Sequence, residues 1–302
     1  MGLFSGRYTK EGPGVSKNAP EKHRFFLFFE LFFRKFSKLV WLNIIYFVTL
    51  IPLMLGLYLS VQINPVITNA IANNTLEGMG GVPLFVFTGD IVGIGLIILS
   101  IFITGPATAG FTYVIRNFQR EEHAWVFSDF REHFRKNYKQ GVLIGLIDVV
   151  AAVLLYVAFV FYVYMMPVQM PDLAMLSTVG ATIVTIIAVA FVVMHFYIYV
   201  MMVTFQLTLK QLLRNALLFT FARLPLNILI FIINGAIILA CLLYPIALFV
   251  LTPIILFSMI GFITVFAVYP SIDKFMLSKI DGGAGGKLEE NPEDTRDFTD
   301  TI

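Results

Sequence analysis

Six long apolar runs constrain the fold of this chain more than any other feature of its sequence. A helix needs roughly 20 predominantly apolar residues to cross the hydrocarbon core of a bilayer, and each run is close to that length or longer. The runs cover residues 39–61, 84–104, 141–166, 174–205, 226–248 and 251–269. We therefore predict an all-α fold, a polytopic membrane bundle of six transmembrane helices.

The composition supports a membrane protein. Hydrophobic residues make up 58% of the 302 residues and charged residues only 13%, whereas a soluble domain carries about 25% charged residues. The mean hydropathy of +0.85 points in the same direction. The single cysteine, Cys241, lies inside an apolar run, so it can form no disulfide within the chain and has no metal-ligand spacing around it.

The charges predict the orientation of the helices. All 21 lysines and arginines fall before the first run, in the connections 116–140 and 206–224, or after the last run. The opposite side carries only Glu77, Asp90 and Asp172. By the positive-inside rule, both termini are expected in the cytoplasm, which requires an even number of spans.

The segments that flank the transmembrane domain (39–272) differ from each other. Residues 1–38 are expected to hold an amphipathic helix that starts near Asn18 and presents phenylalanines at helical spacing next to basic residues. This helix can lie on the inner lipid surface, on the protein's own cytoplasmic side, or on both. Residues 273–302 are glycine-rich and then acidic, which predicts a flexible cytoplasmic tail.

The connection between the second and third runs is predicted to form a helical elbow. Gly105 and Pro106 are expected to end or sharply kink the second span, with one helix over about 107–120 and another from about Ser128. In the second helix acidic residues precede basic ones, as the helix dipole favours. Its aromatic residues form a candidate docking face for lipid or a cytoplasmic partner: Trp125, Phe127, Phe130, Phe134 and Tyr138.

The polar residues inside the spans are the only candidates for chemistry, since no catalytic, metal or phosphate-binding motif is present. Asp148, His195 and Asn234 are expected at similar depth in the cytoplasmic half of the bundle. Ionisable groups are costly in a bilayer, and pairing Asp148 with His195 would relieve both. The cluster is either a structural hydrogen-bond network or a site for a solute or a proton. We predict no enzyme activity, no cofactor, no metal and no nucleic-acid partner.

Two stretches resemble a known family. "GPGVSKNAPEKHRFFLFFELFFRKFSKLVWLN" and "GPATAGFTYVIRNFQREEHAWVFSDFREHFRKNYKQG" are similar to the YesL family of bacterial integral membrane proteins. That family has no established biochemical activity, and its genes typically accompany those for carbohydrate uptake by ABC importers and for glycoside breakdown. The resemblance implies a multi-pass protein of the bacterial cytoplasmic membrane, linked to oligosaccharide import, and it implies no catalytic residues.

The resemblance leaves two functions open. The chain lacks the E-A-A-x-x-x-G motif through which ABC importer permeases dock their ATPase. We therefore expect an accessory subunit that contacts the permease and ATPase subunits of a carbohydrate importer, besides the lipid bilayer. The alternative is a self-contained small-solute permease that uses the level of Asp148, His195 and Asn234.

Overall fold

The computed structural model describes residues 23–72 and 82–277, with side chains for 23–60 and 92–276. Of the described residues, 92% are helical and none is in a strand. Six helical stretches are long and apolar enough to cross a membrane. They are Phe36–Ser60, Val92–Gln119, Tyr138–Gln169, Pro171–Met202, Leu224–Leu243 and Pro245–Met276. The predicted all-α, six-span class is confirmed.

The helical elements follow one another with short connections. In chain order they are α1 (Arg24–Arg34), α2 (Phe36–Ala72), α3 (Val82–Gln119), α4 (Val126–Lys136), α5 (Tyr138–Val160), η2 (Phe161–Met165), α6 (Met166–Gln169), η3 (Pro171–Leu173), α7 (Ala174–Met202), α8 (Leu209–Ala222), α9 (Leu224–Leu243), α10 (Pro245–Leu251), η4 (Thr252–Leu256), α11 (Phe257–Ile272) and η5 (Asp273–Leu277). The segments η2, η4 and η5 are π-helical, and η3 is a single 3₁₀ turn.

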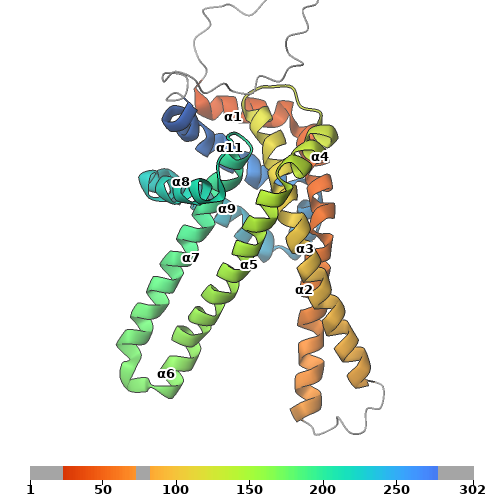
Figure 1. Cartoon of the computed structure of the whole chain (residues 1–302), viewed down its shortest axis with the longest axis vertical. Coiled ribbons are helices and arrows are strands. Elements are labelled where there is room, and N and C mark those ends of the chain that lie inside the picture. The colour runs from red at the N-terminus through yellow and green to blue at the C-terminus, as the bar shows by residue number, and fades with distance from the viewer. Residues whose placement is uncertain (1–22, 73–81, 278–302) are drawn as a thin grey trace, which may run out of the picture.

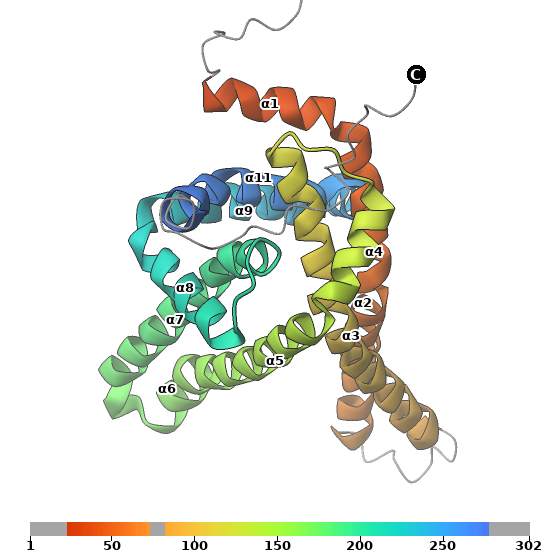
Figure 2. The same cartoon turned by 45° about the horizontal axis from the view of Figure 1, so that its top comes forward.

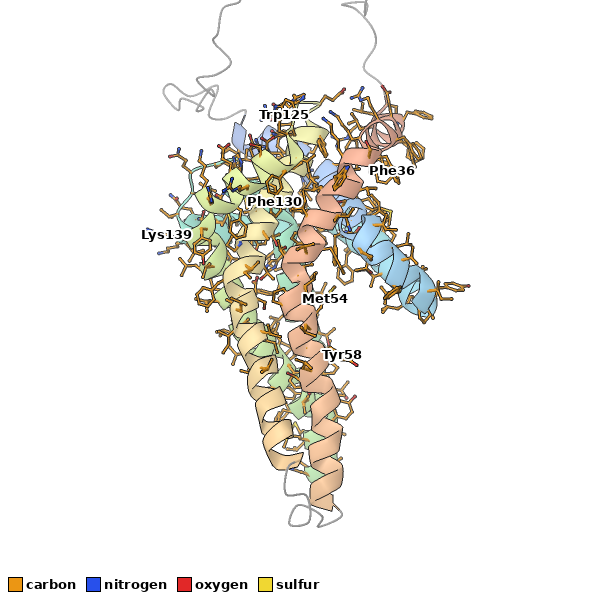
Figure 3. The ribbon with its side chains drawn as sticks, turned by 90° about the vertical axis from the view of Figure 1, so that its right-hand side faces the viewer. Phe36, Met54, Tyr58, Trp125, Phe130 and Lys139 are labelled. Carbon is orange, nitrogen blue, oxygen red and sulfur yellow. The ribbon has the colours of Figure 1, made fainter. Side chains whose placement is uncertain are left out.

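The spans form three hairpins that diverge from one end of the molecule, which we call the joined end. The hairpins α2–α3 and α5–α7 spread apart in Figure 1, and the hairpin of α9 with α10 and α11 leaves in a third direction in Figure 3. The short helices α1, α4 and α8 lie at the joined end (Figures 1 and 2). The first and last described residues lie there as well, as an even number of spans requires.

The core is concentrated at the joined end. Its fully buried large side chains include Leu31 of α1, Leu39 of α2, Phe118 of α3, Tyr197 of α7 and Phe262 of α11. Farther along the hairpins the helices expose large apolar side chains, and only 11% of the apolar window in the third span is buried inside the protein. These surfaces contact the lipid bilayer, which is as apolar as they are, so packing and hydrogen bonds rather than hydrophobic burial hold the hairpins together.

Helix α1 has two apolar faces. On one face Leu31 is buried, and the rings of Phe28 and Phe32 lie 5.4 and 5.9 Å from the ring of Phe262 in α11. The other face exposes four phenylalanines, Phe25, Phe26, Phe29 and Phe33. The helix therefore packs on the protein and also offers a surface to lipid. His23 precedes its first turn, and the expected helix start at Asn18 lies outside the described residues.

The expected break at Gly105 and Pro106 is wrong as a helix end, because α3 continues through Pro106 to Gln119. Two further contacts occur at this turn. The hydroxyls of Thr104 and Thr108 donate to the carbonyls of Ser100 and Thr104, and the backbone of Gly105 lies directly against Gly141 of α5. Packing against a neighbouring helix lets a membrane helix tolerate the absence of the N–H that proline lacks. The first half of the predicted elbow is thus the end of α3.

The second half of the predicted elbow is helix α4, which begins two residues before the expected Ser128. The carboxylate of Asp129 accepts a hydrogen bond of 2.9 Å from the backbone N–H of Trp125 and so caps the first turn. Basic residues occupy the last turn, as expected. The predicted tail from residue 273 begins with η5 (Asp273–Leu277), and its remainder lies outside the described residues.

Candidate functional site

The candidate site in the membrane is a pair formed by Asp148 of α5 and His195 of α7. His195 Nε2 lies 2.9 Å from Asp148 Oδ1. The other ring nitrogen, Nδ1, lies 2.9 Å from the backbone carbonyl of Phe191, one turn earlier in α7. The pair joins the two helices of the second hairpin, as the sequence predicted.

These contacts determine how protons are shared in the pair. A carbonyl oxygen can only accept a hydrogen bond, so Nδ1 of His195 carries a proton. The contact between Nε2 and Asp148 then holds one further proton, which belongs either to an imidazolium beside a carboxylate or to a carboxylic acid beside a neutral imidazole. Both arrangements have zero net charge, which lowers the cost of placing two ionisable side chains in the bilayer. A quarter of the His195 side chain and a third of the Asp148 side chain stay exposed.

Asn234 does not join this pair, contrary to the predicted cluster of three. Its Nδ2 donates to Thr264 Oγ1 at 2.9 Å, across the contact between α9 and α11. Its Oδ1 is buried and has no hydrogen-bond partner among the described residues. The three residues were grouped by their expected depth in the membrane, but depth does not determine which hairpin a side chain faces.

The predicted docking face of α4 is only partly exposed in the structure. Trp125 and Phe127 are 71% and 65% exposed, and Tyr138 is 40% exposed. Phe134 is partly buried against the core, and Phe130 is only 5% exposed. Figure 3 shows Trp125 at the tip of the joined end and Phe130 within the helices. Phe130 is not part of an exposed docking face, because its backbone lies against Gly110 of α3 and turns its ring into the core.

Arg116 is the most informative residue that the sequence analysis missed. It is 8% exposed, and its Nη1 donates to the carbonyl of Val203 at 2.7 Å. Val203 is the C-cap of α7, so the guanidinium lies where the helix dipole favours a cation. Its Nη2 also donates to Asn117 Oδ1 at 3.0 Å. Among the described residues, no carboxylate forms an ion pair with Arg116, and the end of α7 replaces that partner.

Two buried asparagines join the hairpins through backbone groups. Asn43 of α2 donates to the carbonyl of Thr252 at 2.8 Å and accepts from the N–H of Ser258 at 2.9 Å. It thus satisfies backbone groups around the π-helical turn η4, where the regular hydrogen-bond ladder is interrupted. Asn227 of α9 accepts from the hydroxyl of Tyr197 at 2.6 Å and donates to two carbonyls at the end of α8.

His133 of α4 completes the polar group at the joined end. Its ring stacks on Tyr113, and the guanidinium of Arg116 lies 4.6 Å from the same Tyr113 ring. Burial lowers the pKa of His133 to about 4, and the positive charge of Arg116 acts in the same direction. His133 is therefore neutral near pH 7.

Residues 39–159 match a family model described as protein of unknown function, DUF624. This segment is similar to the members of that family. The resemblance to YesL-like proteins is confirmed at this level, since the YesL-like family is a DUF624 family. No curated protein and no solved structure matches the chain.

The DUF624 segment contains one partner in each of three polar contacts described above. Asn43, Arg116 and Asp148 lie within it. Their partners Thr252, Val203 and His195 lie beyond residue 159. The buried side chains of Asn43 and Arg116 therefore hold the hairpin α2–α3 to the other two hairpins at the joined end.

Proposed function

We propose that this protein is a non-enzymatic accessory subunit of an oligosaccharide ABC importer in the bacterial cytoplasmic membrane. The joined end and both termini would face the cytoplasm, where the positive-inside rule places them. The observation that carries the proposal is the divergence of the three hairpins (Figure 1). It leaves helix surfaces of membrane-spanning length available to other membrane subunits.

The exposed surfaces suit association within the membrane. Along α5, Val150, Leu154 and Val157 are 58%, 65% and 59% exposed, and they follow helical spacing on one side of the helix. Between helices in a bilayer such a surface gains from packing whether its neighbour is lipid or protein. A permease helix could therefore replace lipid along α5 with little loss.

The joined end provides a second contact surface. Trp125 and Phe127 are exposed there, and the exposed residues Arg131 and Arg135 lie on the same short helix, α4. Exposed aromatic residues and arginines are the residue types that dominate binding energy at protein interfaces. This surface is the proposed contact with the cytoplasmic parts of the importer.

The proposal is tested by affinity purification from native membranes in mild detergent. We expect permease and ATPase subunits to co-purify with the chain, and Trp125→Ala with Phe127→Ala to reduce their yield. The matched control is Tyr244→Ala with Phe249→Ala, which removes two exposed aromatic rings at the start of α10 and within it, outside both proposed contact surfaces. The absence of importer subunits from the wild-type preparation would contradict the proposal.

The alternative function is a self-contained permease for a small solute or a proton. The pair of Asp148 and His195 favours it, because an ionisable pair inside a span is a common feature of solute and proton pathways. Purified protein in liposomes separates the two functions. Solute or proton flux without partner subunits, lost in Asp148→Asn, would support the permease and contradict the accessory role.

A further inference from the structure

A pocket of about 530 Å³ lies at the joined end, between α1, the start of α9 and the end of α11. Three cationic side chains from separate segments line it, namely Arg24, Arg223 and Lys274. The other described lining residues are apolar or uncharged, and no aspartate or glutamate is among them. We call this the cationic pocket. The pocket lies at the end of two spans, since Arg223 directly precedes the fifth span, which starts at Leu224, and Lys274 lies close to the end of the sixth, at Met276.

Arg24 is held in the pocket by a backbone carbonyl of α11 that lacks its usual hydrogen-bond donor. Pro270 lies inside this helix and has no N–H, so the carbonyl of Phe266 lacks its usual donor four residues later. Arg24 Nη2 donates to that carbonyl at 2.7 Å. The rest of the guanidinium remains available, because arginine has five N–H donors. Burial lowers the pKa of Arg24. A lowered pKa is expected for a cation that has lost its hydrating water without gaining an anionic partner.

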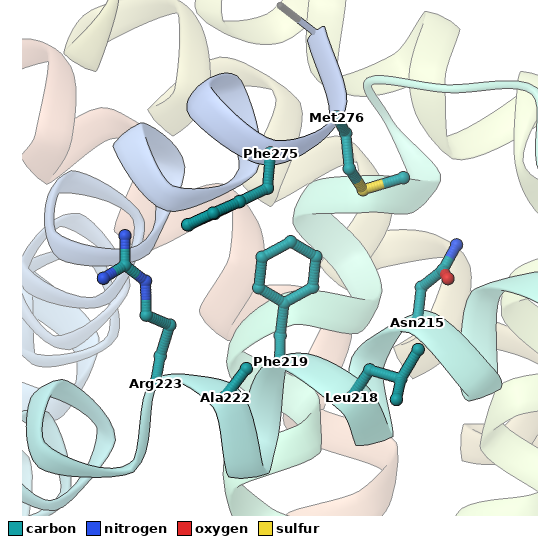
Figure 4. Close-up of a pocket in the computed structure, with 7 residues that line it drawn as sticks. All are labelled: Asn215, Leu218, Phe219, Ala222, Arg223, Phe275 and Met276. Atoms are coloured by element: carbon teal, nitrogen blue, oxygen red, sulfur yellow. The ribbon is translucent and has the colours of Figure 1, made fainter. Parts of the chain in front are cut away.

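Arg223 is the second fixed cation, at the turn between α8 and α9. Its Nε is buried and has no hydrogen-bond partner within the part of the chain that the structure describes. Its guanidinium lies 4.8 Å from the ring of Phe275, and Figure 4 shows the two side chains side by side next to a neighbouring pocket of about 380 Å³. Neither Arg24 nor Arg223 forms an ion pair with a carboxylate of the described residues. The two arginines thus line one pocket, and their N–H donors bind no anionic side chain of the described residues.

We propose that the cationic pocket binds the phosphate of an anionic phospholipid headgroup. Guanidinium groups match the geometry of phosphate oxygens and are weakly hydrated, which suits a partly buried anion site. Basic pockets between transmembrane helices are known to bind such headgroups. The exposed Leu224 and Ile228 continue from the turn along α9, so acyl chains attached to the phosphate would lie against apolar side chains.

The test measures lipid retention by the whole chain in nanodiscs and in native mass spectrometry. The wild type is compared in phosphatidylglycerol and in phosphatidylcholine, because only the first has a net negative headgroup. Arg223→Gln removes a pocket cation, and Arg223→Lys keeps the charge without the planar fork. The matched control is Arg214→Gln, an exposed arginine of α8 outside the pocket. Circular dichroism confirms that each variant stays helical.

We expect the wild type to prefer phosphatidylglycerol and Arg223→Gln to weaken that preference about tenfold, as the loss of one charge-assisted hydrogen bond predicts. Arg223→Lys should lie between the two, and Arg214→Gln should behave as wild type. Equal effects of Arg223→Gln and Arg214→Gln would overturn the proposal, since they would indicate attraction by net charge alone. Binding of inorganic phosphate without a lipid preference would also overturn it and would assign the pocket to a free phosphate.

Discussion

His195 of α7 and Asp148 of α5 lie 2.9 Å apart, Nε2 to Oδ1, and share one proton between two helices of the same hairpin. Asp148→Asn should keep a hydrogen bond but lose the shared proton. We expect the free energy of unfolding to fall by about 1 kcal/mol, which is typical for a polar contact between membrane helices. Thermal unfolding in detergent measures the change. Asp172→Asn, in the exposed turn before α7, is the control, and an equal loss in both variants would contradict a specific role of the pair.

Asn43 is expected to be among the most sensitive positions for stability. Asn43→Ala would leave the carbonyl of Thr252 and the N–H of Ser258 buried without partners, which should cost about 2–4 kcal/mol. Thr49→Ala is the control, because its hydroxyl donates only to the carbonyl of Tyr46 in the same helix. Similar midpoints of thermal unfolding for the two variants would show that the asparagine does not hold the π-helical turn.

Arg116 should be required for stability through its bond to the end of α7. Arg116→Gln removes the cation that contacts the Val203 carbonyl, and we expect a loss of about 1.5–3 kcal/mol. Arg120→Gln is the control, since Arg120 forms a half-exposed ion pair with Glu122 worth about 0–1 kcal/mol. Chemical denaturation followed by circular dichroism distinguishes the two, and a larger loss for Arg120→Gln would contradict the assignment.

His133 predicts a pH dependence of stability. Burial lowers its pKa in the folded protein to about 4, below the value of about 6.5 expected in an unfolded chain. The unfolded state therefore binds the proton first, and stability is lost as the pH falls from about 6.5 toward 4. His133→Gln should weaken this loss, and the exposed His123→Gln should not. Unfolding midpoints measured across this range provide the test, and parallel curves for wild type and His133→Gln would contradict it.

The contact between Gly105 and Gly141 predicts opposite effects for two glycines of α3. A methyl group at Gly105 would collide with the backbone of Gly141, so Gly105→Ala should separate α3 from α5 and destabilise the protein. Gly95→Ala meets open space and should be neutral or stabilising by up to about 1 kcal/mol, since alanine favours the helix. Equal stability of the two variants would show that the helices do not approach as closely as described.

The sequence was enough to predict the features that the bilayer requires. It missed the features that depend on how the helices pack against one another. Six apolar runs and the cost of two ionisable groups were enough to predict the spans and the pairing of Asp148 with His195. Pro106 was expected to end a helix, but the close approach of Gly105 to Gly141 outweighs its local preference. Because α3 was predicted to stop near residue 104, Arg116 was assigned to a connection, and its burial could not be foreseen. Extending the apolar pattern through Pro106 would have placed Arg116 within a span and identified it as unusual.

Anchoring at only one end has a mechanical consequence for the three diverging hairpins. A membrane helix adapts to a thinner bilayer by tilting. In this molecule tilting a hairpin widens the spread of the free ends, while the contacts of Asn43, Arg116 and Asn227 at the joined end stay in place. Bilayer thickness therefore affects the distance between the free ends of the three hairpins. Any subunit seated between the hairpins would experience that change directly.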